Sequence, residues 1–258
     1  MVLLPMYWII YTALLPEELV YSWPPRLIPS RLMPDYFINI FKAYPILRWM
    51  MNSFIVSLFT VCISVPPAVL AGYGFYRYTK FRGRSTLFSF LFLVTCVPPT
   101  IIIIPYFIML NTWGLIDTLI GLAITYVSFV LPLQVILYYS YLFSIPREIE
   151  EAAMIDGASK LRILTSIILP LSYPGIAAIS IYAFNLAWNE FAFAITLLRS
   201  QSNWTTVIGI YSFIGQWKMD WNGAMVTSIY TTIPSFIFFF LTQKYFIKGL
   251  TAGALKGK

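Results

Sequence analysis

The sequence predicts an all-α membrane protein of about six transmembrane helices, with a polar helix-turn-helix segment between two of them. Hydrophobic residues make up 59% of the 258 residues, whereas charged residues make up only 10%, and the mean hydropathy is +0.78. Such a chain has too little polar surface to cover a water-soluble core. Long apolar runs flank one short charged stretch, which favours membrane spans joined by a polar connection.

The predicted spans follow from the lengths of the apolar runs. A spanning helix takes about 20 apolar residues, because the hydrocarbon core is about 30 Å thick and a helix rises about 1.5 Å per residue. Residues 1–15 reach only about 22 Å and read as the second half of a span, so we expect the true start to lie upstream. A signal peptide is disfavoured, since there is no basic leading region and no small-residue cleavage site. One domain of residues 1–258 then contains spans at about 1–15, 53–75, 87–110, 119–143, 176–198 and 224–246, and a tail at 247–258.

The distribution of Lys and Arg predicts the orientation. If the carboxyl terminus is cytoplasmic, eleven of the 17 basic residues fall in cytoplasmic segments, in agreement with the positive-inside rule. These eleven are Arg77, Lys80, Arg82, Arg84, Arg147, Lys160, Arg162, Lys244, Lys248, Lys256 and Lys258. We therefore expect a multi-pass protein of the cell membrane with both termini in the cytoplasm. The net charge of +7 then reflects topology, and no basic face is left over for nucleic acid.

The sequence offers few side chains that suit catalysis within the membrane. The sequence contains no histidine, and its two cysteines lie inside expected spans. Glu190 is the one acidic residue inside a span, which disfavours a metal site or an acid–base pair in the membrane. The Walker A pattern is absent, so the chain does not itself hydrolyse a nucleotide through a P-loop. We predict no catalytic residue, no metal and no cofactor in this chain, and therefore no enzyme.

The charged stretch at residues 145–170 reads as two helices joined by a turn. Pro146 suits a helix start, and the acidic residues that follow it would lie near the positive end of the helix dipole. Gly157 can supply the reversal that ends this helix. A second helix from 158 to 168 then leads into the next span.

The predicted surface of this stretch suits docking. Ala152 and Ala153 leave a smooth surface that another protein can approach closely, and Ile149 and Ile155 offer apolar contact. An amphipathic loop resting on lipid headgroups fits the same residues. The residues alone leave both alternatives open.

Polar residues in the fifth expected span form a candidate substrate path. Glu190 should face protein or a hydrated cavity and find a donor, because a carboxylate within a span costs about 2.5 to 3.5 kcal/mol on insertion scales. Helical spacing places four residues close to one stripe, with Glu190 at its edge and Trp188 beside it: Tyr182, Asn185, Asn189 and Thr196. This combination suits a neutral hydroxylated ligand. The same groups also suit contact with a partner helix, so both interpretations stay open.

One motif carries a resemblance to a known family. The motif consists of Glu151-Ala152-Ala153, then Gly157, then Ile167-x-Leu169-Pro170. It is similar at every position to the cytoplasmic coupling motif of permease subunits of bacterial and archaeal binding-protein-dependent ABC importers. The likeness covers nearly the whole chain and is closest to the maltose-type carbohydrate branch. Residues 5–8, 188–191 and 249–257 also carry it.

The resemblance implies a permease subunit of an ATP-driven importer that translocates a sugar delivered by an extracellular binding protein. It also implies a second permease subunit in a heterodimer and two ATPase subunits, which would hold the ATP and Mg. Monosaccharides, disaccharides and oligosaccharides all fit. A permease for a non-sugar solute such as glycerol phosphate is the alternative, and a secondary transporter is weaker because the spans hold one acid and show no inverted repeat.

The resemblance also assigns residues to partners. The loop at 199–221 matches the loop that touches the external binding protein. The tail would reach between the two ATPase subunits with Gly249, Leu250, Thr251, Ala252 and Gly253. The polar segment would seat in a cleft of an ATPase subunit through Glu151, Ala152, Ala153, Ile155, Asp156 and Gly157.

Overall fold

The chain folds into an elongated bundle of helices. The structure is a computed structural model that describes residues 3–24, 27–29, 31–215 and 219–254, without the side chains of Phe239 and residues 241–254. Within these residues the secondary structure is helical, apart from one isolated antiparallel bridge between Ile214 and Met219. The all-α prediction is confirmed.

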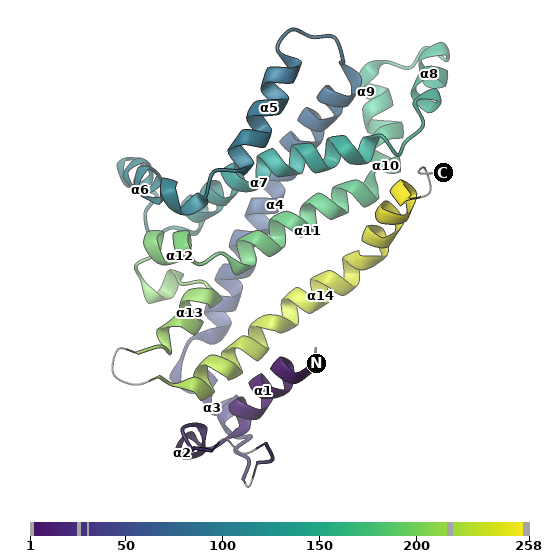
Figure 1. The fold of residues 1–258 in the computed structure, drawn as a ribbon. Coiled ribbons are helices and arrows are strands. Elements are labelled where there is room, and N and C mark those ends of the chain that lie inside the picture. Colours follow the sequence, from purple (N-terminus) through teal and green to yellow (C-terminus); the bar gives the residue numbers. More distant parts are fainter. Residues whose placement is uncertain (1–2, 25–26, 30, 216–218, 255–258) are drawn as a thin grey trace.

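Three helices form the centre of the bundle, namely α4 (Ile46–Arg77), α7 (Leu119–Leu142) and α11 (Tyr173–Asn189). Helix α4 packs along both α7 and α11. A glycine permits the close approach of α4 to α7, since a Cβ atom at Gly72 would lie 2.9 Å from Cδ1 of Tyr138. Helix α14 (Trp221–Ala254) lies along α11 on one side and along α1 (Leu3–Leu14) on the other (Figure 1).

Two apolar segments are bent. Helix α5 (Arg84–Thr95) meets the short 3-10 turn η1 (Pro99–Ile102) and α6 (Ile103–Thr112) at an angle of 91°. Pro98 and Pro99 lack the N–H groups that would continue α5, which explains the break inside the expected span at 87–110. The other bend, of 73°, separates residues 160–171 from α11. Residues 160–171 comprise α9 (Lys160–Ile163), the π-helical turn η2 (Leu164–Ile168) and α10 (Leu169–Leu171).

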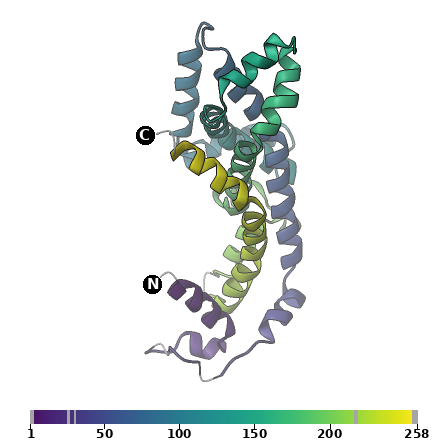
Figure 2. The ribbon, with the colours of Figure 1, turned by 90° about the vertical axis from the view of Figure 1, so that its right-hand side faces the viewer.

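The two ends of the bundle carry different elements (Figures 1 and 2). One end holds α8 (Arg147–Ile155) and α9, and the last turns of α14 lie in the same half of the molecule. The opposite end holds α2 (Glu17–Val20), α3 (Tyr36–Ala43) and α13 (Thr206–Ser212). The short elements α12 (Ala192–Leu197) and η3 (Gln201–Asn203) connect α11 to α13.

The number of spans stays a prediction. In the described part of the chain, α4 and α7 are long and apolar enough to cross a membrane by themselves, and each bent pair adds one span if it is counted as a unit. The expected spans at 1–15, 119–143 and 224–246 correspond to α1, α7 and part of α14. The expected span at 176–198 is divided, because α11 ends at Asn189 and α12 begins at Ala192.

Candidate functional site

The polar segment forms a sharp turn between α8 and α9, and we call residues 147–171 the elbow. Gly157 follows α8 in the left-handed region, with φ of 79°. Its N–H donates to the carbonyl oxygen of Met154 at 3.0 Å, and the N–H of Ala158 donates to that of Ala153 at 3.0 Å. This pair of bonds is a Schellman motif, which needs a residue that tolerates positive φ at Gly157. The hydroxyl of Ser159 then caps α9 by accepting the N–H of Arg162 at 3.3 Å.

The outer face of the elbow gathers most of the predicted coupling residues. Glu151, Ala152, Asp156 and Gly157 are exposed, and Ile155 exposes 87% of its surface. Covering an exposed isoleucine removes apolar surface from water, so the geometry of this turn suits contact with another protein.

Ala153 is the one predicted coupling residue that lies on the inner face of α8. Its side chain is buried, and it packs in the core with Tyr76 of α4 and Leu142 of α7. The reason is helical spacing: Ala153 lies three residues after the buried Glu150, so both point from the same inner face of α8.

The inner face of α8 carries an ion pair that sequence reasoning missed. Glu150 is only 4% exposed, and its Oε2 lies 3.2 Å from Nε of Arg77, the last residue of α4. Arg77 also donates to the sulfur of Met154 at 3.0 Å. Burial raises the pKa of Glu150 above its ordinary value, and the charges of Arg77 and Arg147 only partly offset that effect. Deprotonated Glu150 therefore depends on Arg77 for compensation.

Two aromatic contacts fix the elbow to the same end of α4. The guanidinium of Arg147 lies 5.2 Å from the ring centre of Tyr76, and the ammonium of Lys160 lies 5.4 Å from that of Tyr78. Both distances are within the range of cation–π attraction. Residues 76–78 thus hold both helices of the elbow.

Glu190 has the donors that its position requires. It lies at the break between α11 and α12 with extended backbone. The hydroxyl of Tyr126 donates to its Oε2 at 2.7 Å, and the N–H groups of Phe193 and Ala194 donate to its carboxylate at 3.0 and 3.2 Å. The carboxylate therefore caps α12 and joins it to α7.

The remaining residues of the predicted substrate path divide into two groups. Asn185 and Asn189 follow one another along α11, and each donates to the carbonyl oxygen four residues earlier, at 3.2 and 2.8 Å. Tyr182 is half-buried on the same helix. Trp188 points elsewhere, because it is buried and stacks on Phe184 with 5.6 Å between ring centres. In this conformation the Trp188 ring is not available to a ligand.

The loop at 199–203 is fixed to the loop before α7. Asp117 Oδ1 accepts the N–H groups of Arg199 and Ser200 at 2.9 and 3.0 Å, and its Oδ2 accepts the Ser200 hydroxyl. Asn203 donates to the Asp117 carbonyl oxygen at 2.6 Å. Burial alone raises the pKa of Asp117, but these hydrogen bonds outweigh it and hold the pKa below the ordinary 3.8.

The lowered pKa predicts acid sensitivity of this loop. Because the folded state favours the deprotonated form, the stabilisation is present above pH 3.8 and is lost as the pH falls through the lowered pKa. We expect the hydrogen-exchange protection of residues 199–203, relative to the intrinsic exchange rate at each pH, to fall in acid. Asp117→Asn should weaken the loop by about 1 kcal/mol already at pH 7 and remove the acid step. Asp35→Asn, in a different loop, is the matched control, and an unchanged acid step in Asp117→Asn would exclude this assignment.

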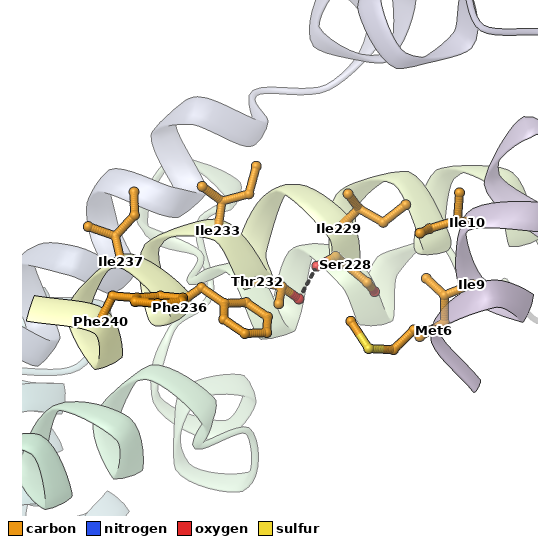
Figure 3. Close-up of a pocket in the computed structure, with 10 residues that line it drawn as sticks. All are labelled: Met6, Ile9, Ile10, Ser228, Ile229, Thr232, Ile233, Phe236, Ile237 and Phe240. Carbon is orange, nitrogen blue, oxygen red and sulfur yellow. Dashed lines mark hydrogen bonds between the residues drawn. The ribbon is translucent and has the colours of Figure 1, made fainter. Parts of the chain in front are cut away.

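A cavity of about 590 Å³ lies between α1 and α14 (Figure 3). Its two hydroxyl groups donate to carbonyl oxygens of their own helix, Ser228 to Ala224 and Thr232 to Ser228, at 2.7 Å each. The rest of the wall is apolar, which does not suit a hydrated sugar. The lining residues are Met6, Ile9, Ile10, Ser228, Ile229, Thr232, Ile233, Phe236, Ile237 and Phe240.

Two of the predicted contacts fall partly outside the described residues. The predicted tail contact involves Gly249 to Gly253, whose backbone belongs to α14 but whose side chains lie outside the description. Part of the loop predicted to touch the binding protein, residues 216–218, also lies outside the described residues. As for metals, no group of three or more Cys, Asp or Glu residues in the described ranges could hold an ion.

The fold and the motif together define a class of membrane component. Residues 64–252 match the family described as "Binding-protein-dependent transport system inner membrane component". The chain belongs to this family. Its members are permease subunits of ABC transporters, which are not themselves enzymes.

Relatives and a solved structure agree with this membership. The chain is 32% identical to the trehalose transport system permease protein SugB of Mycobacterium tuberculosis over 257 residues, which cover 99% of this chain and 93% of that protein. It is 35% identical to the trehalose/maltose transport system permease protein MalG of Thermococcus litoralis over 229 residues, 88% of this chain and 80% of that protein. A subunit of a bacterial ABC transporter that imports alginate shares the fold, with a TM-score of 0.78, 22% identity and coverage of 95% of this chain and 91% of that one.

Proposed function

We propose that this chain is one permease subunit of an ATP-driven importer that translocates a sugar delivered by an extracellular binding protein. The observation that carries the proposal is the exposed, Schellman-locked elbow at residues 151–157 in a member of this permease family. The names of the relatives in Mycobacterium tuberculosis and Thermococcus litoralis, which transport trehalose or maltose, support a sugar as the cargo.

The importer would contain a second permease subunit and two ATPase subunits. The ATPases would hold the ATP and Mg, and this chain would contribute no catalytic residue and no cofactor. The outer face of the elbow would seat in a cleft of one ATPase, and closure of the ATPase pair would tilt α8 and α9. Alternating access of the cargo site to the two sides of the membrane would follow.

The elbow end would face the cytoplasm, together with the carboxyl terminus. The described start of α1 lies in the opposite half of the molecule (Figure 1), and the cytoplasmic position of the amino terminus stays a prediction. Supporting this orientation, the basic residues Arg77, Arg147 and Lys160 gather where α4 meets the elbow, and the last described turns of α14 lie in the same half of the molecule (Figure 1). The positive-inside rule favours this side for the cytoplasm.

The cargo path would run beside α11. The amide groups of Asn185 and Asn189 and the phenol of Tyr182 can exchange hydrogen bonds with sugar hydroxyl groups. Trp188 and Glu190, which the sequence also placed on this path, would support its wall, since the first packs inward and the second caps α12.

Reconstitution tests the proposed function. The chain would be co-expressed with candidate partner subunits, namely a second permease, an ATPase and a binding protein, and the purified complex would be placed in proteoliposomes. We expect ATP-dependent uptake of a disaccharide such as trehalose or maltose in the presence of the binding protein. Glycerol 3-phosphate is the non-sugar control. Uptake of glycerol 3-phosphate alone would contradict the sugar assignment, and failure of any ATPase to co-purify would contradict the importer assignment.

A further inference from the structure

Helix α4 connects the two ends of the molecule without a break. It contains 32 residues, which corresponds to a length of about 48 Å at about 1.5 Å per residue. It continues as a helix through Pro66 and Pro67, beyond which Ala68 and Val69 are buried in the core with α7. Figures 1 and 2 show that α4 runs from the end that carries α8 to the end that carries α3.

The carboxyl-terminal end of α4 contacts the inner face of the elbow. Arg77 binds Glu150 at 3.2 Å and Met154 at 3.0 Å. Glu150 is buried, and its Oε1 has no hydrogen-bond partner. Because Glu150 is shielded from water while Arg77 is partly exposed, removing Arg77 leaves an uncompensated buried charge, and the pair depends on the relative position of its two groups.

The amino-terminal end of α4 contacts the loop predicted to meet the binding protein. Asn52 donates to the carbonyl oxygens of Ser202 and Trp204, both at 2.9 Å. Arg48 donates to the same Ser202 oxygen at 2.8 Å. The Ser53 hydroxyl, 2.9 Å from that of Thr206, also accepts the Thr206 N–H. The backbone of residues 202–206 is therefore fixed directly to the first turns of α4.

The covalent route from the elbow to the same loop is less direct. It passes through the π-helical turn η2, the 73° bend before α11 and the break at Glu190. Each interruption removes regular hydrogen bonds and gives the route a point where it can bend. Helix α4 has fewer such points, so it transmits an axial or tilting displacement more directly than the covalent route does.

We infer that α4 links the 202–206 loop to the elbow, with Asn52 and the Arg77–Glu150 pair as the positioning contacts at its two ends. This inference rests on the proposed function and adds to it a route by which the 202–206 loop acts on the elbow. Docking of the loaded binding protein on the loop would move α4, and Arg77 would carry that movement to α8 and so to the ATPase. In this proposal Asn52, Arg77 and Glu150 act through their positions, without touching nucleotide or cargo.

The test measures how far the loaded binding protein stimulates ATP hydrolysis by the assembled transporter in nanodiscs. We expect Arg77→Met and Asn52→Leu each to reduce the stimulation about tenfold, a typical size for coupling between sites, with basal hydrolysis retained. Because both residues act on one route, the double variant should lose no more than either single variant. Arg82→Met, which removes an exposed arginine in the loop after α4, is the matched control and should stimulate as wild type does.

Charge variants separate positioning from folding. If Arg77→Met does not assemble because Glu150 is left unpaired, Arg77→Met/Glu150→Gln removes both charges, and assembled complex with weak stimulation would support the inference. The exchange Arg77→Glu/Glu150→Arg should restore stimulation at least in part. Wild-type stimulation in Asn52→Leu and in Arg77→Met/Glu150→Gln would overturn the inference that α4 links the loop to the elbow. A wild-type complex that binds no ATPase would refute the proposed function instead.

Discussion

Gly157→Val is expected to leave the importer hydrolysing ATP without matching sugar uptake, or to detach the ATPase subunits. Gly157 has φ of 79°, and apart from its two chain neighbours no residue has an atom within 4 Å of the position that a Cβ would take. Steric crowding by neighbours is therefore not the cause. A β-branched residue in the left-handed region costs roughly 1 to 3 kcal/mol, and the turn relieves that cost by leaving the Schellman geometry, which changes the angle between α8 and α9.

The measurement is the ratio of sugar transported to ATP hydrolysed in proteoliposomes, together with the amount of ATPase that co-purifies. Gly157→Asn should be close to wild type, because asparagine tolerates positive φ. Gly74→Val introduces the same side chain into open space at the end of α4, where φ is not positive, and should couple normally. An unaltered ratio in Gly157→Val would remove the elbow from the mechanism.

The geometry of the elbow turn was predictable because its signals are local. Proline, three glutamates and a glycine within a dozen residues specify where α8 begins and how it ends, and the residue that caps α9, Ser159, follows two positions after the glycine. Each of these residues acts on backbone groups within a few positions of itself. The structure accordingly places the turn at the glycine where the sequence analysis expected it.

The orientation of α8 was not predictable from the same residues. Whether Ala153 lies outside or inside depends on which face of α8 meets α4, and that is decided by Arg77, which lies 73 positions before Glu150. The basic residues around Arg77 predicted only the membrane orientation, since a count of charges carries no information on pairing. The available signal was the spacing of Glu150 and Ala153. They lie three residues apart and therefore share one face of α8, so burial of one implies burial of the other.

The break at Glu190 has a similar origin. The apolar run at 176–198 contains no glycine or proline near its middle, so nothing local predicted that α11 would stop at Asn189. The sequence analysis did predict that Glu190 must find a donor, and it finds one in Tyr126, 64 residues earlier in the chain. Tyr126 lies on α7 and is buried in the core of the bundle. Composition and periodicity do not predict which residues meet in that core.

Substitutions at Glu190 should lower the stability of the complex without changing the affinity for sugar. Glu190→Leu leaves the N–H groups of Phe193 and Ala194 and the Tyr126 hydroxyl without their acceptor, which we expect to cost roughly 3 kcal/mol. Glu190→Gln keeps one oxygen acceptor but presents an amide donor to the others, and should cost about 1 kcal/mol. Tyr126→Phe removes a single hydrogen bond and should resemble Glu190→Gln.

Thermal unfolding of the detergent-solubilised complex and the KM for sugar uptake together decide between a cap and a ligand-binding group. For a cap, the unfolding temperature falls in the order wild type, Glu190→Gln, Glu190→Leu, while the KM of the surviving complex stays at the wild-type value. Asn189→Leu, one residue away on the proposed cargo path, is the contrasting variant: it should raise the KM and leave the unfolding temperature nearly unchanged, because Asn189 is exposed and donates only to its own helix. A raised KM at full stability in Glu190→Gln would instead make the carboxylate a cargo ligand, with Tyr126 as the group that orients it.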